Sequence, residues 1–162
     1  EIKKEVAQSS NNAKGSEQNN QIIDNPNYYL QIPNGWTIKS SEKFNSGELV
    51  KLHSGRETGS LSLRFANESV NIDELLQNQI NNAKNDNSFE NLRIGQQFEK
   101  WGGNSGKGVF MKFNSSGVEM NVTYFFAKTE RQSLIATYIC SSSDQPYLES
   151  DVQSIAGSLK LK

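Results

Sequence analysis

Residues Gly106–Cys140, GKGVFMKFNSSGVEMNVTYFFAKTERQSLIATYIC, hold three apolar runs separated by two polar turns. The runs are Val109–Phe113, Val118–Ala127 and Ser133–Cys140. In the middle run, apolar residues recur at every second position from Val118 to Phe126, which is the period of a strand with one buried face. The pattern predicts an antiparallel meander of three strands and two hairpins. We expect the rest of the chain to pack on this meander.

Two other segments have the 3.6-residue period of amphipathic helices. The first is predicted over Asn71–Lys84, where Asn71 is a good N-cap and Glu74 occupies the capping-box position. Its apolar stripe is Ile72, Leu75, Leu76, Ile80 and Ala83. The second follows Cys140, with Pro146 in its first turn and Gly157 as its expected end. Its stripe is Leu148, Val152, Ile155, Ala156 and Leu159.

Shorter strands are predicted on either side of the first helix. They are Tyr28–Ile32, Glu48–His53, Ser60–Ala66 and Phe89–Trp101, with a further extended stretch from Trp36 toward Lys39. The order is therefore short strands, a helix, long antiparallel strands and a second helix. Because both helices have one apolar face to bury, this order predicts an α+β fold in which two helices flank an antiparallel sheet.

The composition fits one domain and argues against several function classes. The 162 residues include 17 Lys and Arg against 18 Asp and Glu, so the basic field of a nucleic-acid-binding protein is not expected. The single cysteine, Cys140, and the single histidine, His53, cannot form a disulfide or a Cys/His zinc site within one chain. No run approaches the roughly 20 apolar residues that span a bilayer. We expect no cofactor and no metal.

The first 25 residues differ in composition from the rest. They are rich in Asn, Ser, Gln and Lys, which predicts a disordered polar tether over 1–25 and a folded domain over 26–162. A polar spacer of this kind suits a surface-anchored protein. Since the chain begins at Glu1 without methionine, we expect an upstream targeting segment and a lipid anchor. The expected location is outside the cell, on the outer face of the membrane or the cell surface.

The stretch Ile32-Pro33-Asn34-Gly35-Trp36 resembles the opening of the PsbP-like family. The likeness extends in element order over about residues 27–162, through the helix from Asn71 and the meander to Ile155-Ala156-Gly157-Ser158-Leu159. The resemblance implies an α/β/α sandwich around an antiparallel sheet and a protein that binds partners without catalysis. The Asn- and Lys-rich start is more similar to the bacterial exported lipoproteins of this family than to its photosynthetic members.

Four residues are candidates for a partner-binding surface at the ends of the meander. They are Trp101 and Lys107, beside a glycine-rich turn, and His53 and Arg56, in the turn after a short strand. A phosphate loop over 102–108 is not expected, because Trp101 and Gly108 stand where that motif needs Gly and Ser or Thr. Cys140 is expected to be a buried structural thiol. A weak divalent-ion site at Asn85–Ser88 stays open.

Three functions remain after these exclusions. The first is a non-enzymatic accessory domain that binds a protein or envelope component. The alternative is a carrier of a small apolar ligand, with a cavity between sheet and helix that some of the eight Phe and five Tyr would line. The third, an enzyme, would have to rely on carboxylates alone, because the chain has one histidine and no metal motif. We therefore expect no enzymatic activity.

Overall fold

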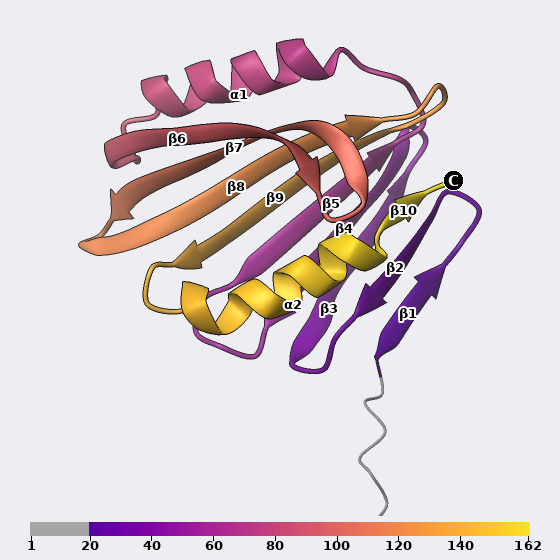
Figure 1. Ribbon diagram of the computed structural model, residues 1–162, viewed down its shortest axis with the longest axis horizontal. Helices are drawn as coiled ribbons and strands as arrows, with labels where there is room; N and C mark the ends of the chain where they lie inside the picture. The colour runs from indigo at the N-terminus through magenta and orange to yellow at the C-terminus, as the bar shows by residue number, and fades with distance from the viewer. Residues whose placement is uncertain (1–19) are drawn as a thin grey trace, which may run out of the picture.

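The computed structural model describes residues 20–162, which form ten strands and two helices (Figure 1). The first five strands are β1 (Gln21–Asp24), β2 (Tyr28–Ile32), β3 (Trp36–Phe44), β4 (Gly47–Ser54) and β5 (Ser60–Ala66). Helix α1 (Ile72–Asn85) leads to the long strands β6 (Glu90–Trp101), β7 (Asn104–Ser115), β8 (Val118–Lys128) and β9 (Ser133–Ser141). Helix α2 (Gln145–Ser158) and β10 (Lys160–Leu161) complete the chain.

A seven-stranded antiparallel sheet with the order β3-β4-β5-β9-β8-β7-β6 forms the centre of the molecule. The predicted meander is confirmed as β7, β8 and β9, which lie next to one another. A smaller sheet has the order β1-β2-β10. Neither helix in the described part of the chain has the length and apolar character that a membrane-spanning helix requires.

The two faces of the large sheet carry separate hydrophobic cores. On the α1 face, Leu76 and Ile80 of α1 pack against residues of β7 and β8 such as Met111 and Tyr124. On the opposite face, which we call the α2 face, side chains of β4, β5, β8 and β9 pack with α2 and with β2. The predicted α+β fold with two flanking helices is therefore confirmed (Figure 1).

Helix α1 begins and stays in place for the reasons expected from its sequence. The Asn71 side chain accepts a hydrogen bond from the Glu74 amide at 3.3 Å, so the predicted N-cap is confirmed. The helix contacts β6, β7 and β8 but leaves β3–β5 uncovered on its side. Accordingly, β5 carries the exposed Arg64 and β4 the exposed His53 on that face. The core on the α2 face thus draws mainly on β4, β5, β8 and β9, whereas α1 packs on β6, β7 and β8.

Several boundaries differ from the prediction. Residues 1–19 of the expected tether lie outside the described residues, but Gln21–Asp24, at its end, form β1 and pair with β2. Strand β3 runs on to Phe44, and β10 pairs with Tyr28 and Tyr29. Helix α2 passes through Gly157 and ends at Ser158. These short or exposed strands exist because a neighbouring strand completes their hydrogen bonds, which a local apolar pattern does not reveal.

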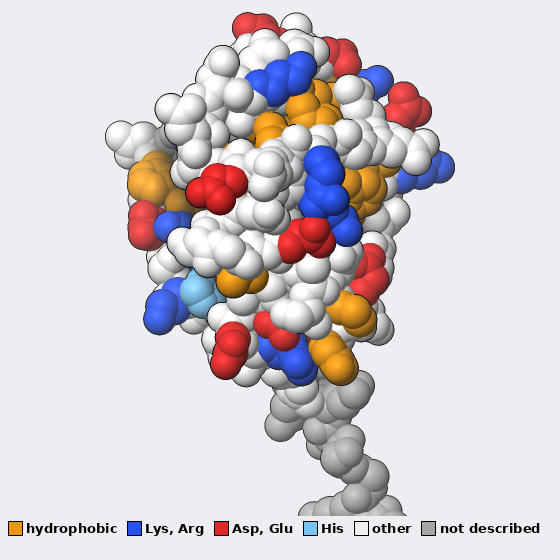
Figure 2. All heavy atoms as spheres, turned by 90° about the vertical axis from the view of Figure 1, so that its left-hand side faces the viewer, with side chains coloured by type: hydrophobic (Ala, Val, Ile, Leu, Met, Phe, Trp, Pro, Cys, Tyr) orange, Lys and Arg blue, Asp and Glu red, His pale blue; other side chains and the backbone are white. Residues whose placement is uncertain are grey.

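The end of the molecule at the left of Figure 1 has a mixed surface. Figure 2 shows basic and acidic side chains interspersed there, with small apolar patches between them. This face therefore lacks a broad field of one charge sign, in line with the near-zero net charge of the chain.

Candidate functional site

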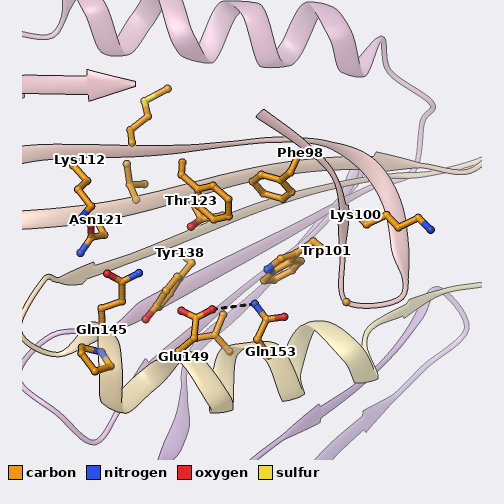
Figure 3. A pocket seen from close by; sticks show the side chains of 16 residues that line it. Phe98, Lys100, Trp101, Lys112, Asn121, Thr123, Tyr138, Gln145, Glu149 and Gln153 are labelled. Carbon is orange, nitrogen blue, oxygen red and sulfur yellow. Dashed lines mark hydrogen bonds between the residues drawn. The ribbon is translucent and has the colours of Figure 1, made fainter. Parts of the chain in front are cut away.

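A cleft of about 640 Å³ lies between α2 and the α2 face of β6–β9 (Figure 3). Its position follows from the side chains of β8. On the α2 face of this strand, Asn121 and Thr123 are followed by the buried, apolar Phe125 and Ala127. The apolar part belongs to the core shared with α2, while the polar part lines the cleft. The change from polar to apolar within one strand face therefore sets where the core ends and the cleft begins.

One end of the cleft is a group of aromatic rings. Phe98 of β6 stacks on Phe110 of β7, with ring centroids 4.4 Å apart, and on the fully buried Phe125 at 5.9 Å. Trp101 lies 5.7 Å from Phe125 in a tilted arrangement. Phe98 can lie flat here because Gly108 is opposite it, and a Cβ on that glycine would come within 2.2 Å of the Phe98 ring. Phe110 is 49% exposed, so the aromatic end is open to solvent.

The other end of the cleft contains buried polar groups from two neighbouring strands. Asn121 of β8 and Tyr138 of β9 are 8% and 5% exposed. Asn121 Oδ1 has no hydrogen-bond partner among the described residues, and the Tyr138 hydroxyl has only the Cys140 thiol beside it, a weak partner that does not meet hydrogen-bond geometry. Leaving such a group unsatisfied costs about 1–3 kcal/mol. Burial also raises the pKa of Tyr138, so its hydroxyl remains protonated.

The helix supplies the third wall of the cleft, with Gln145, Glu149 and Gln153 facing the sheet (Figure 3). Gln153 Nε2 donates a hydrogen bond to Glu149 Oε1 at 3.1 Å. Lys112 lines the cleft from the sheet side, and its Nζ lies 3.9 Å from Oε1 of Glu119, a residue outside the cleft lining. The lining thus combines an aromatic surface with a few polar groups, which is the usual character of a small-molecule site.

The structure does not gather the four residues that the sequence suggested. Trp101 is buried and lines the cleft, but Lys107 lies on the α1 face, 3.3 Å from Glu99 and 3.8 Å from Asp73. His53 is exposed on the uncovered part of the α1 face. Arg56 lies near the start of α2. These residues do not form one surface, and Trp101 alone belongs to the cleft.

Arg56 belongs to a polar cluster that fixes the β4–β5 loop onto α2. Its Nε contacts Asp144 Oδ1 at 2.8 Å, and its guanidinium lies 4.1 Å above the Tyr147 ring. Asp144 also accepts hydrogen bonds from the Thr58 hydroxyl and amide, at 2.6 and 3.0 Å. The bonds from Thr58, and then Arg56, lower the pKa of Asp144. This carboxylate is fully engaged in holding the loop.

The remaining chemical candidates are also accounted for. Cys140 is buried, as predicted, and burial raises the pKa of its thiol, which disfavours the nucleophilic thiolate. Asp86, in the segment considered for a divalent ion, accepts hydrogen bonds from the amide and hydroxyl of Ser88. Residues 20–162 contain no group of three or more His, Cys, Asp or Glu that could hold a metal ion.

The sequence did not indicate Phe98, Phe110, Asn121 or Tyr138 as site residues. Their assembly depends on where α2 lies relative to the sheet, and no local pattern encodes that distance. One signal was present, because Asn121 and Thr123 are polar whereas Phe125 and Ala127, further along the same face of the strand, are apolar and buried. Polar residues at such positions indicate a place where the covering layer ends.

Comparison with known proteins supports the fold and goes no further. No protein-family model matches the chain, and no curated protein matches its sequence. Cyanobacterial PsbP from Synechocystis sp. PCC 6803 aligns with a TM-score of 0.56, covering 95% of this chain and 98% of its own, at 11% identity. LpqN of Mycobacterium tuberculosis, described as involved in cell envelope biogenesis, aligns with a TM-score of 0.53, covering 90% and 92%, at 10% identity.

A third similar structure comes from Bacteroides thetaiotaomicron, with a TM-score of 0.52 and 10% identity. The alignment covers 83% of this chain and 45% of that protein, so the chain spans less than half of its length. Together these likenesses confirm the PsbP-like fold that the residues around Trp36 suggested. They leave the ligand and the partner to be argued from the cleft.

Proposed function

We propose that this PsbP-like domain is a non-enzymatic binding domain and that the cleft between α2 and β6–β9 is its site for a small, partly apolar ligand. The cleft is the observation that carries the proposal. Its volume of about 640 Å³ falls within the roughly 300–1,000 Å³ of small-molecule sites, and its aromatic rings are accompanied by a few polar groups. This favours the carrier alternative over an extended protein-binding surface at the ends of the meander.

Three features support a role without catalysis. Among the described residues, Asp144 is the one buried carboxylate, and its oxygens already accept hydrogen bonds from Arg56 and Thr58. Cys140 is a buried thiol whose raised pKa disfavours the thiolate. His53 lies on the opposite face of the sheet from the cleft. The carboxylate that lines the cleft, Glu149, accepts a hydrogen bond from Gln153, and neither His53 nor Cys140 lies in the lining. A nucleophile with a histidine base beside it is therefore not brought to the ligand.

The cellular location is part of the same proposal: the domain acts outside the cell, held to the membrane by a lipid anchor upstream of Glu1. The polar composition of residues 1–25 supports this, as does the fold shared with LpqN, described as involved in cell envelope biogenesis. The gene sequence upstream of Glu1 tests the proposed location and lipid anchor. A signal peptide ending in a lipobox cysteine is expected, and a cytosolic start would overturn this part.

Filling the cleft tests the binding proposal. Thr123 lines the cleft, and Thr137 occupies the opposite face of the neighbouring strand β9. Thr123→Phe is expected to weaken binding of the uncharged fluorophore N-phenyl-1-naphthylamine at least about tenfold, because the added ring occupies the ligand volume. Thr137→Phe, the same change on the other face, is expected to leave binding unaltered.

The measurement is a fluorescence titration, with thermal unfolding to show that both variants fold. Equal binding by the wild type and Thr123→Phe would place the fluorophore elsewhere and contradict the proposal. Absence of binding by the wild type would do the same.

A further inference from the structure

Two buried oxygen atoms that border the cleft define the ligand's head group more closely than volume does. Both are closed to solvent, so a ligand reaches them by displacing the side chains that cover them. Four buried side-chain oxygens in residues 20–162 lack a hydrogen-bond partner, and two of them, Asn121 Oδ1 and the Tyr138 hydroxyl, belong to cleft residues. Both side chains are more than nine-tenths buried. Because Asn121 pairs with Cys140 and Thr123 with Tyr138, the two side chains are diagonal neighbours on the same sheet face.

The hydrogen bonds around Asn121 determine which way its amide points. The Ser142 hydroxyl donates to Glu119 Oε1 at 2.6 Å, so Ser142 Oγ is left to accept. Asn121 Nδ2 donates to that oxygen at 2.9 Å, which fixes the amide with Oδ1 as the free atom. A ligand must therefore bring a hydrogen-bond donor to Asn121.

Tyr138 requires the opposite kind of hydrogen-bonding group in the ligand. Its ring extends from β9 toward the first turn of α2, with Gln145 and Glu149 alongside (Figure 3). A protonated phenol donates one hydrogen bond, so a ligand that satisfies it must bring an acceptor. The pair together selects a head group that both donates and accepts.

The rest of the cleft sets the body and the charge of the ligand. The buried Phe125, which stacks with Phe98, lies four residues from Asn121 along β8, or about 13 Å in an extended strand. Flat rings stack favourably on such a surface. Charged side chains of both signs line the cleft, Lys100 and Lys112 against Glu149, so the lining has no surplus of one sign that would select an ionic head, and a neutral head fits it.

From these contacts, and resting on the proposed function of the cleft, we propose that the ligand is an uncharged amphiphile. Its flat apolar body packs on Phe98 and Phe110. Its head, of the amide or alcohol type, donates to Asn121 Oδ1 and accepts from the Tyr138 hydroxyl. Such a ligand satisfies the two of the four unpaired oxygens in residues 20–162 that belong to cleft residues.

A matched series of naphthalenes tests this inference by displacement of N-phenyl-1-naphthylamine and by calorimetry. Naphthalene-2-carboxamide carries a donor and an acceptor, 2-naphthoate is charged, and 2-ethylnaphthalene has no polar head. The carboxamide is expected to bind about tenfold more tightly than either comparison compound. Equal affinity of the three would overturn the head-group inference while leaving binding in the cleft intact. Failure of all three and of the fluorophore would overturn both.

A pair of tyrosine variants provides the second part of the experiment. Tyr138→Phe removes only the hydroxyl and is expected to weaken the carboxamide about tenfold while leaving 2-ethylnaphthalene unchanged. Tyr124→Phe, the same change on the α1 face, is expected to change neither affinity. If Tyr138→Phe binds the carboxamide as the wild type does, the proposed role of Tyr138 is wrong.

Discussion

Replacing Phe125 by alanine is expected to lower the free energy of unfolding by about 3–5 kcal/mol, the usual cost of deleting a buried phenyl ring. Phe125 is fully buried in β8 and lies within 6 Å of both Phe98 and Trp101, measured between ring centroids. Its removal leaves a cavity in the core on the α2 face, next to the aromatic end of the cleft. For a domain with a typical stability of about 5–15 kcal/mol, this loss is a large fraction of the total.

Urea unfolding followed by circular dichroism measures this effect. Phe44→Ala is the matched control, because Phe44 is 49% exposed at the end of β3 and its truncation is expected to cost about 1 kcal/mol or less. Similar losses for both variants would mean that the rings around Phe125 do not form a packed cluster.

The second large effect is expected at Gly102, where the β6–β7 hairpin meets α2. Gly102 has a φ of +59°, and a Cβ at this position would lie 2.2 Å from the backbone carbonyl of Ala156. Gly102→Ala therefore combines left-handed backbone strain with overpacking against the helix, for a cost of roughly 2–5 kcal/mol. Because Gly102 also lines the cleft, the change is expected to weaken fluorophore binding.

The adjacent residue provides the control. A Cβ on Gly103 meets nothing within 4 Å, so Gly103→Ala is expected to alter stability by no more than about 0.5 kcal/mol. Chemical denaturation of the two variants side by side tests the contrast. Equal stabilities would show that the hairpin does not approach the helix as closely as described. The contrast also explains the glycine-rich stretch: Gly102 permits close packing on α2, and a phosphate is not needed to account for it.

The sequence predicted the parts of the fold that depend on local pattern. The stripe and N-cap of the first helix are strong periodic signals, and both are confirmed. The alternation from Val118 to Phe126 correctly predicted a strand, but its single buried face was wrong: Phe125 and Ala127 of the other face are buried too, and Val118 is exposed. Strands β1 and β10 were missed because four and two residues carry too little pattern, and pairing with β2 creates them. Local signals thus identified the central sheet, the helices and β2, but not the two strands that pair with β2 to make the small sheet.

The cleft could not be predicted from the sequence, for a different reason. Trp101 was chosen for its place beside a flexible-looking turn, yet it belongs to the site because the Gly102 contact brings the hairpin against α2. Asn121 and Tyr138 look like ordinary sheet residues until their hydrogen bonds are counted. Both facts depend on the packing distance between helix and sheet, which only the tertiary structure supplies.

The central claim is that the cleft between α2 and the sheet is the binding site, and backbone amide NMR of the labelled 162-residue chain tests it most directly. On titration with N-phenyl-1-naphthylamine, the largest shift changes are expected at Phe98, Thr123 and Tyr138 on the sheet and at Val152 on α2. Residues of the other core, such as Ile80 of α1, are expected to change little. Shifts centred on α1, or none at saturating fluorophore, would contradict the account.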